Sequence, residues 1–415
     1  MRAESRSVPC HEALILLQSP PGAARPKRRS RPRGSESDPE GKNEPRAETI
    51  EKQGFPHYML KEIHEQPETV AAAMRGRLRP AEGTARLEEL NPLLAHLKKT
   101  GHLTLLSCGT SYYAGLYGRY LFEALTPLTV DVDVASEFRY RKIRFPADTA
   151  AVAISQSGET ADTLAAVQEA KRAGTLTLGL VNVERSSIAR AVDAAVPMRA
   201  GPEVGVASTK CFTSEGVILL LLALSLGRER GLGPAEGTRI LRGLEALPDQ
   251  LRAVLGQKEK IRALAEKYHK SSDFLFVGRK HNHPLAFEGA LKLKEVSYIH
   301  AEAYPAGEMK HGPIAMIDAD FPSLALAPQD ETYDKMLSDI RELKTRGGKV
   351  IAVATEGDKK IGTLADDVLF IPPAVELISP LLAAVPLQLF AYYCAVARGC
   401  PVDRPRNLTK SVTAE

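Results

Sequence analysis

Hydroxyl side chains gather where one predicted strand ends. Residues 155–160 read Ser-Gln-Ser-Gly-Glu-Thr; they follow a buried strand at 151–154 and precede a helix that begins near Ala161. A helix N-terminus offers unpaired backbone N–H groups and a partial positive charge. Hydroxyls and a flexible glycine there can bind a phosphate without a lysine, whereas a P-loop would need a Lys-Ser/Thr pair after its second glycine. An ordinary capped strand–turn–helix is the alternative interpretation.

A second polar loop has the same position relative to its own strand. The predicted strand at 103–107 runs into Cys108-Gly109-Thr110-Ser111, where the next helix begins. Ligands of doubly wound sheets bind at the carboxyl ends of strands, near a topological switch point. We therefore expect the two loops to meet around one anion, bound by Thr110, Ser111, Ser155, Gln156, Ser157 and Thr160.

Three further side chains could carry acid–base chemistry. Lys292 and Glu295 lie three residues apart on a predicted helix, hence on one face, and their helix neighbours are largely apolar. A carboxylate in such a setting can have a raised pKa and can transfer a proton between adjacent carbons; a surface ion pair is the alternative. His311 lies in a turn, where a structural histidine is the alternative to an acid–base group.

Lys410 lies in a polar C-terminal segment, residues 404–415, that has no periodicity. A frayed tail is the ordinary interpretation of such a segment. If the tail instead folds over a pocket, its lysine can serve as a Schiff-base amine.

The elements that must position these side chains form two similar cycles. Strands are predicted at 103–107, 130–134, 151–154 and 176–181, and again at 274–277, 324–327, 350–354 and 368–371. Helical periodicity occurs at 67–78, 86–99, 213–226, 236–268, 284–296 and 332–345. Strands that alternate with helices indicate a parallel sheet covered on both faces. We predict a tandem duplication of one doubly wound α/β unit.

The two copies differ chemically at the loop that could bind phosphate. The second copy reads Pro-Gln-Asp-Glu-Thr at 328–332, so it lacks two serines and the glycine and carries carboxylates that would repel phosphate. We therefore expect one phosphate site and not two.

The composition is that of an ordinary globular protein, with 415 residues, 44% hydrophobic and 26% charged, and a net charge of +4. Residues 1–50 hold ten Lys/Arg, seven Asp/Glu and seven prolines, which is typical of a disordered basic tail. Weak nucleic-acid contact through this tail is a disfavoured alternative. No uninterrupted apolar run reaches the roughly 18 residues of a spanning helix. The five cysteines show no metal-ligand spacing and no disulfide framework, which indicates a reducing, cytoplasmic compartment.

These motifs together resemble a known family, the isomerase half of glucosamine-6-phosphate synthase (glutamine–fructose-6-phosphate aminotransferase, isomerizing). That half has two sugar isomerase (SIS) domains in tandem, with a flavodoxin-like nested fold. The resemblance covers roughly residues 50–415 and rests on Cys-Gly-Thr-Ser-Tyr at 108–112, the serine-rich loop at 155–160, Gly-Val-Ala-Ser-Thr-Lys at 205–210, Lys-Leu-Lys-Glu at 292–295, His-Ala-Glu-Ala-Tyr at 300–304, Lys-His-Gly-Pro at 310–313 and the closing residues 407–415.

The resemblance implies a domain layout. We expect a disordered tail at 1–50, a helical lead-in at 51–100, a first SIS domain with the phosphate site at 101–230, connecting helices at 231–268, a second SIS domain with the acid–base helix at 269–400, and a C-terminal tail at 401–415 that reaches the active site.

The resemblance also implies roles for individual residues. The phosphate site falls on Ser111, Ser155, Gln156, Ser157 and Thr160, and the sugar chain on Thr110, Ser208 and the backbone around Val206. Glu295 matches the base of the 1,2-proton transfer, with Lys292 beside it. Lys410 matches the lysine that forms an imine with the open-chain ketose. His311 matches the ring-opening histidine, which in that family reaches the partner subunit's site, so a homodimer is expected.

The implied reaction converts fructose 6-phosphate and ammonia into glucosamine 6-phosphate, for amino-sugar biosynthesis and the UDP-N-acetylglucosamine pathway. No metal or organic cofactor is needed. The family's glutaminase half, with its cysteine directly after the initiator methionine, has no match: position 2 is Arg2, and Cys10 lies in no recognisable nucleophile setting. We expect no glutaminase activity in this chain, and ammonia from solution or from a separate glutaminase subunit.

Two other functions remain open at this point. A catabolic glucosamine-6-phosphate deaminase would run the same reversible steps backwards, and binding of a glutaminase partner would discriminate against it. A sugar-phosphate-binding regulator without catalysis would be expected to have lost Glu295, Lys292 or Lys410, and all three are present. Neither alternative involves a membrane.

Overall fold

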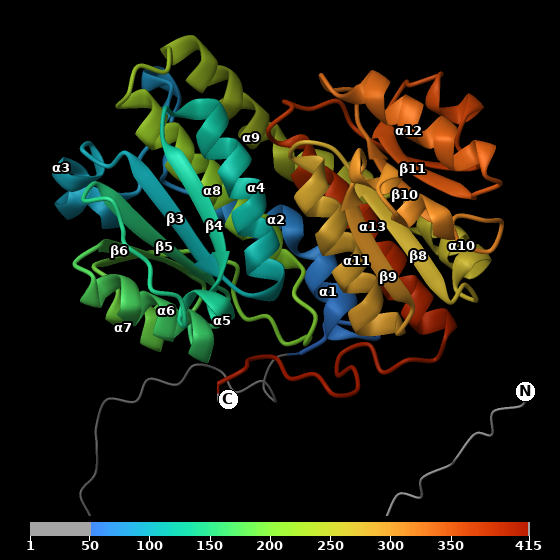
Figure 1. Cartoon of the computed structure of the whole chain (residues 1–415), viewed down its shortest axis with the longest axis horizontal. Coiled ribbons are helices and arrows are strands. Elements are labelled where there is room, and N and C mark those ends of the chain that lie inside the picture. The colour runs from blue at the N-terminus through green and yellow to red at the C-terminus, as the bar shows by residue number, and fades with distance from the viewer. Residues whose placement is uncertain (1–50, 414–415) are drawn as a thin grey trace, which may run out of the picture. The chain divides into compact units, whose positions relative to one another are not determined.

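Two five-stranded parallel sheets organise the described part of the chain (Figure 1). A computed structural model describes residues 51–413; the tail expected at 1–50 lies outside them. The first sheet has the order β4-β3-β5-β6-β7 and the second β12-β11-β10-β8-β9. Both sheets are parallel throughout, which confirms the predicted pair of doubly wound α/β units.

The strands are short and largely apolar, as expected of parallel sheets buried on both faces. In the first sheet they are β3 (His102–Ser107), β4 (Thr129–Val134), β5 (Thr149–Ser155), β6 (Leu176–Val181) and β7 (Ala194–Pro197). In the second they are β8 (Asp273–Gly278), β9 (His300–Pro305), β10 (Ser323–Ala327), β11 (Val350–Thr355) and β12 (Asp367–Ile371). A two-stranded ribbon, β1 (Leu78–Arg79) and β2 (Thr84–Ala85), precedes them.

Helices cover both sheets and join the two units. The lead-in holds α1 (Tyr58–His64), α2 (Gln66–Met74) and α3 (Leu94–Leu97). The first unit has α4 (Gly109–Leu125), α5 (Ala135–Phe138), α6 (Ala161–Arg172), α7 (Ser187–Ala191) and α8 (Lys210–Arg228). The connection consists of α9 (Pro234–Leu255) and α10 (Lys258–Tyr268), and the second unit has α11 (Asn282–Ser297), α12 (Tyr333–Thr345) and α13 (Ser379–Ala397).

Each sheet has a switch point between two central strands. In the first sheet the chain passes from β3 outward to β4 and then returns to β5 on the other side of β3; in the second it passes from β8 to β9 and returns to β10. The loops after β3 and β5, and likewise those after β8 and β10, therefore start side by side at the carboxyl edge and run in opposite directions, which leaves a crevice between them. This topology makes the two polar loops of the first unit neighbours.

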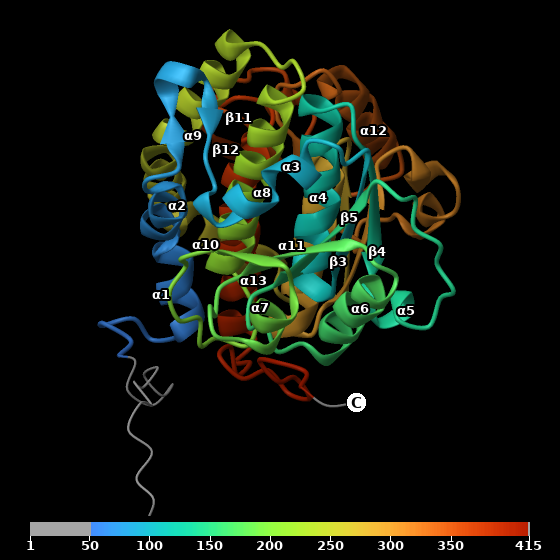
Figure 2. The same cartoon turned by 90° about the vertical axis from the view of Figure 1, so that its left-hand side faces the viewer.

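One large hydrophobic cluster spans both units. Helix α4 packs against α8 and α11, and α11 packs against α13, so these helices lie between the sheets (Figures 1 and 2). By length and composition α8 and α13 could cross a membrane, although the sequence shows no uninterrupted apolar run of that length. However, 94% and 83% of their apolar windows are buried inside the protein, which is typical of core helices.

Three local expectations were wrong. The helix predicted at 86–99 is a 3-10 segment, Glu88–Leu93, followed by the short α3, because Pro92 interrupts regular α-helical hydrogen bonding. The single helix predicted at 236–268 is two helices, which separate at Gly256 and Gln257. Strands β7 and β9 were not predicted; both lie at sheet edges, and in β9 two buried residues alternate with residues that are exposed or half-buried.

Candidate active site

A cleft of about 300 Å³ lies at the carboxyl ends of β3 and β5. Its walls come from the loops after these strands, from the segment before α8, from α11 of the second unit and from the C-terminal tail. Every residue predicted to bind substrate lines it, as do Glu295 and Lys410; the full lining is Cys108, Gly109, Thr110, Ser111, Ile154, Ser155, Gln156, Ser157, Thr160, Thr163, Val206, Ser208, Glu295, Leu408, Thr409, Lys410, Ser411 and Val412.

The serine-rich loop is held in shape by its own hydroxyl groups. The Ser155 hydroxyl accepts a hydrogen bond from the Gly158 N–H at 3.0 Å, and the Ser157 hydroxyl accepts one from the Glu159 N–H at 3.2 Å. Gly158 has a φ of 64°, and a Cβ added there would lie 1.9 Å from the Ser186 hydroxyl oxygen. Only glycine fits this turn, so the loop's curvature around the start of α6 depends on it.

The second polar loop is tied to buried carboxyl groups. The Ser111 hydroxyl donates to Glu215 Oε1 at 2.7 Å. The Thr110 hydroxyl donates to Glu288 Oε1 at 3.3 Å and accepts from Lys292 Nζ at 2.9 Å. Thr110 therefore links α4 of the first unit to α11 of the second across the cleft.

Lys292 and Glu295 form an ion pair between a buried lysine and a partly buried carboxylate, and not the surface pair considered from their spacing. The Lys292 side chain is completely buried, and its Nζ lies 2.6 Å from Glu295 Oε2 and 3.5 Å from Glu288 Oε1. Burial by itself would lower the pKa of Lys292, but the two carboxylates outweigh it and raise the pKa. Lys292 thus stays charged and holds Glu295, whose side chain is 21% exposed, at the cleft wall.

Two buried acids beneath the cleft have raised pKa values. Burial raises the pKa of Glu215 to about 8 and that of Glu288 to about 8. One oxygen of each carboxyl group has no hydrogen-bond partner among the described residues. Near neutral pH Glu215 therefore retains its proton, because ionisation in this apolar setting costs more than in water.

Lys410 is anchored in the cleft by a third carboxylate. Its Nζ donates to Glu203 Oε2 at 2.6 Å and to the Gly205 carbonyl at 2.7 Å. Burial by itself would raise the pKa of Glu203, but the charge and hydrogen bond of Lys410 lower it to about 2. Burial, with the Glu203 charge adding to it, raises the pKa of the neighbouring Glu62 to about 7. The tail lysine is thus oriented by one permanent anion.

The C-terminal tail folds over the cleft. The Val412 carbonyl accepts a hydrogen bond from the Ala161 N–H at 3.1 Å, at the start of α6. The Asp403 carbonyl accepts one from the Val206 N–H at 3.1 Å. Figure 1 shows the tail, drawn in red, passing from the second unit to the first. The ordinary interpretation of residues 404–415 as a frayed end was wrong for the described part.

His311 does not line this cleft. It is exposed and follows the 3-10 turn Glu308–Lys310, as the turn prediction required. Its backbone N–H donates to the Glu308 carbonyl at 2.9 Å. The chain therefore brings together every predicted site residue except His311.

Sequence reasoning missed the carboxyl groups behind the site. Glu288 had a usable signal, since it lies four residues before Lys292 on the same helix face. Glu215 also had a usable signal. It is a single acid in the long apolar helix α8, and acidic residues are rarely buried in such a helix without a partner. Glu203 and Glu62 carried no local signal, because their partners are distant in sequence.

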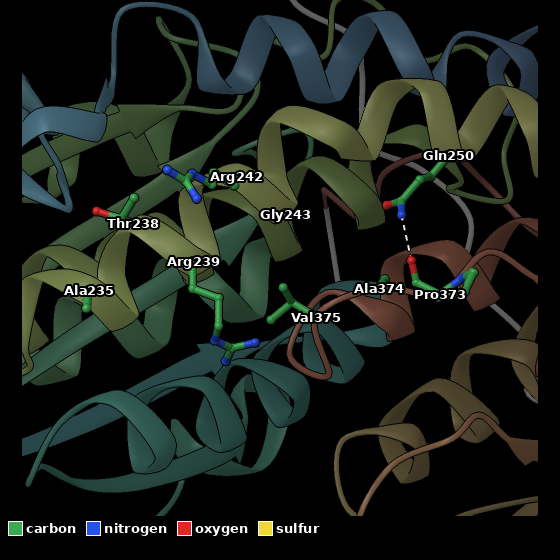
Figure 3. Close-up of a pocket in the computed structure, with 9 residues that line it drawn as sticks. All are labelled: Ala235, Thr238, Arg239, Arg242, Gly243, Gln250, Pro373, Ala374 and Val375. Atoms are coloured by element: carbon green, nitrogen blue, oxygen red, sulfur yellow. Dashed lines mark hydrogen bonds between the residues drawn. The ribbon is translucent and has the colours of Figure 1, made fainter.

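A larger cavity, of about 720 Å³, lies elsewhere, between α9 and the segment before α13 (Figure 3). The Gln250 side-chain amide donates to the Pro373 carbonyl at 2.8 Å across it. Arg239 makes two hydrogen bonds to Glu236, at 2.8 and 2.6 Å. Its lining contains no carboxylate, histidine or lysine. The smaller cleft, which has Glu295 and Lys410 in its lining, is therefore the better candidate for a catalytic site.

Comparison with protein families identifies the two units. The SIS domain family matches residues 96–225 and 267–398. Glutamine–fructose-6-phosphate aminotransferase [isomerizing] of Chlorobaculum tepidum is 50% identical over 368 residues, and that of Thermus thermophilus is 52% identical over 370 residues. Each match covers 89% of this chain but 60% of the relative. The chain thus spans about three fifths of the length of these curated relatives.

Solved structures agree with this result. The C-terminal domain of glucosamine-fructose-6-phosphate aminotransferase from Francisella tularensis is 38% identical, with a TM-score of 0.81, and the match covers 86% of this chain and 100% of that one. A glucosamine-6-phosphate deaminase from Thermotoga maritima is 24% identical, with a TM-score of 0.62, and covers 86% of this chain and 99% of that one. At that identity the second match shows the fold alone.

Proposed function

The chain belongs to the SIS domain family, whose domain it carries twice, and on this premise we propose that it aminates and isomerises fructose 6-phosphate to glucosamine 6-phosphate. One observation carries the proposal: a cup of hydroxyls, a tail lysine and the Lys292–Glu295 pair line or adjoin a single cleft although they come from four separate segments of the chain. The named relatives support the same substrate.

The hydroxyl cup holds the substrate's phosphate. Ser111, Ser155, Gln156, Ser157 and Thr160 offer hydroxyl and amide donors, and the start of α6 adds a favourable dipole. Lys410 lines the same cleft, within reach of the open-chain carbon skeleton. Binding of the phosphate end thus places the sugar's C2 carbonyl against the lysine.

Lys410 then activates the C2 carbonyl. Its amine, after proton loss, adds to C2 and expels water, which gives an imine between C2 and the lysine. Ammonia adds to the same carbon and displaces the lysine amine, which leaves a C2 imine of the sugar. Glu203 holds the lysine in position and accepts its hydrogen bond between these steps.

Glu295 carries out the isomerisation. It takes a proton from C1 of the protonated imine, so that the C–H electron pair forms a C1–C2 double bond and the C=N electron pair moves to the nitrogen, which becomes a neutral amine. Return of a proton to C2 and loss of the C1 hydroxyl proton give the aldehyde of glucosamine 6-phosphate. Lys292, 2.6 Å from Glu295, stabilises the carboxylate form that begins the transfer.

The test is turnover by the purified full chain. Fructose 6-phosphate with ammonium is expected to yield glucosamine 6-phosphate, which mass spectrometry distinguishes from glucose 6-phosphate. Borohydride added during turnover should leave a reduced sugar adduct on Lys410, and a Lys410→Met variant should carry none. Glu295→Gln should retain the adduct and lose the product. Neither product nor adduct from the wild-type protein would contradict the proposal.

The proposal extends to the direction of the reaction, the source of its ammonia and the oligomeric state of the chain. We propose cytoplasmic synthesis by a homodimer in which His311 of each chain opens the sugar ring in the partner's cleft. Ammonia comes from solution or from a separate glutaminase. Rapid ammonia release from glucosamine 6-phosphate, with no glutaminase partner and no net synthesis at millimolar ammonium, would favour the deaminase instead.

A further inference from the structure

The second unit has a counterpart of the substrate cleft with different chemistry. The loops after β8 and β10 meet at the switch point of the second sheet, as those after β3 and β5 do in the first. The segment before α13 completes this place, as the segment before α8 completes the cleft. Here the side chains are His281, Asn282, Asp330 and Glu376, in place of serines and threonines.

Three of these side chains present donor atoms to one point. One ligand atom each from His281, Asp330 and Glu376 lies within 4.8 Å of the others. His281 Nε2 is 3.4 Å from Glu376 Oε1. Asn282 donates from its side-chain amide to Asp330 Oδ2 at 3.0 Å. Ligand atoms of one metal ion lie about 3–4 Å apart when each bond to the metal is about 2.1 Å. Small side-chain rotations would therefore bring the three ligand atoms to the separations that a bound metal ion requires.

The histidine at this place is buried without a hydrogen bond to either ring nitrogen. His281 is 1% exposed, and neither ring nitrogen has a hydrogen-bond partner among the described residues. Asn282 is also 1% exposed, and its side-chain oxygen is likewise unpaired. Buried polar atoms normally find partners, because desolvation without one costs about 1–3 kcal/mol. These atoms therefore point to a ligand.

We propose that His281, Asp330 and Glu376 bind a divalent first-row transition-metal ion such as Zn²⁺. One imidazole and two carboxylates form a mixed nitrogen–oxygen set that suits such ions. Asp330, Glu331 and Glu376 outnumber Lys280, so the cluster has excess negative charge that a dication would neutralise. The proposal does not depend on the function proposed for the first cleft.

Lys280 competes with the metal in this arrangement. Its Nζ lies 3.0 Å from Glu376 Oε1 and 2.5 Å from Glu331 Oε1. A metal ion bound through Glu376 Oε1, the oxygen next to His281, would displace Lys280 from that oxygen, and Glu331 can retain the lysine. The lysine therefore weakens metal affinity, and its removal should strengthen it.

The metal would be structural and not a participant in the proposed chemistry. It would join the N-terminus of α11 to the loop after β10 and to the segment before α13. Helix α11 also carries Lys292 and Glu295. Binding at its first turn would thus fix the position of the helix that supplies the proton-transfer pair.

The test uses tag-free full-length protein treated with a chelator and titrated with Zn²⁺ and Co²⁺. Calorimetry should give one tight site, and bound Co²⁺ should show visible absorption without a thiolate charge-transfer band. His281→Gln should weaken binding by at least the roughly 10- to 100-fold that loss of a supporting ligand contact costs. Lys280→Met should tighten binding by about tenfold, since it removes a competing cation.

His300→Gln is the matched control. His300 also contacts two carboxylates, with Nδ1 2.9 Å from Asp273 and Nε2 3.5 Å from Glu302, but its side chain is 59% exposed. Unchanged binding in His281→Gln, loss of binding in His300→Gln, or a thiolate band would overturn the proposal. If His281→Gln fails to fold by circular dichroism, Lys280→Met decides: no gain in affinity rejects the site.

Discussion

At the scale of single residues, the cleft depends on a buried acid that keeps its proton. Glu215 accepts the hydrogen of Ser111 at 2.7 Å, directly behind the predicted phosphate cup. An ionised carboxylate there would repel a phosphate dianion. With its pKa raised to about 8 by burial, Glu215 orients the serine near neutral pH and adds no negative charge. Its protonation therefore suits the anion site.

The raised pKa of Glu215 predicts a stability that falls with rising pH. Between the ordinary value of 4.5 and about 8, the folded protein binds a proton that the unfolded chain releases. Unfolding free energy should thus decrease across this range, by up to about 1.4 kcal/mol per pH unit for one such group. Glu215→Gln removes this contribution, and urea unfolding at pH 5, 6, 7 and 8 measures the slope.

Glu82→Gln serves as the control for this measurement. Glu82 is exposed, so the Glu82→Gln variant should show the same change of unfolding free energy with pH as the wild-type protein. Parallel slopes for Glu215→Gln and wild type would show that Glu215 ionises normally in the folded state.

At the scale of elements, one aspartate joins the tail to the lead-in. Asp403 accepts hydrogen bonds from the Tyr58 and Met59 N–H groups, both at 3.0 Å, at the start of α1. Its carbonyl accepts from Val206, which lines the cleft. Asp403, which lies 344 residues after Met59, thus caps α1 and also positions the tail that carries Lys410.

Asp403→Ala should therefore affect stability and activity together. Loss of the cap is expected to reduce unfolding free energy by about 1–2 kcal/mol. Turnover should fall as well, since the tail becomes less ordered near Lys410. Chemical denaturation and steady-state kinetics measure the two effects.

Asp403→Asn gives the matched comparison, because its side-chain oxygen can retain one of the two caps. A smaller loss than in Asp403→Ala is expected. If both variants are as stable as wild type, the cap contributes nothing to folding.

Element prediction succeeded where hydrophobic pattern and length agreed. The central strands were located within a few residues, because buried parallel strands are continuous apolar runs. The starts of α4 and α6 and both ends of α11 and α12 were also located within a few residues. The edge strand β9 was missed because its exposed face makes it resemble a loop. The segment at 86–99 was misassigned because its apolar spacing suggested a helix that Pro92 disrupts.

At the scale of the whole molecule, the cleft is formed by both units. Thr110 from the first unit contacts Glu288 and Lys292 from the second. His311 lies outside this cleft, as expected if the histidine serves the partner subunit. The proposed dimer would then supply each cleft with its last group.

Subunit exchange tests this arrangement. Dimers of His311→Ala and dimers of Glu295→Gln should each be inactive. After mixing and exchange, a mixed dimer has one cleft with intact Glu295 and the partner's intact His311. Activity near one quarter of wild type is expected at complete random exchange, because half of the dimers are mixed and each has one working cleft.

Native mass spectrometry confirms the exchange independently of activity. A mixture of wild-type protein with Glu295→Gln gives the reference activity for wild-type subunits that exchange with an inactive variant. Complete exchange without recovered activity would show that His311 acts within its own chain or not at all.

The sequence by itself determined the architecture and most of the cleft's hydroxyl groups. Strand–loop–helix order places Thr110 and Ser111 at the same sheet edge as Ser155–Thr160, because the carboxyl ends of parallel strands meet at one edge. The observed strand order β4-β3-β5 then makes the two loops neighbours. Only the tertiary structure decided the electrostatics. Glu62, Glu203, Glu215 and Glu288 act through burial and through partners distant along the chain, and these depend on how the two units and the tail pack together.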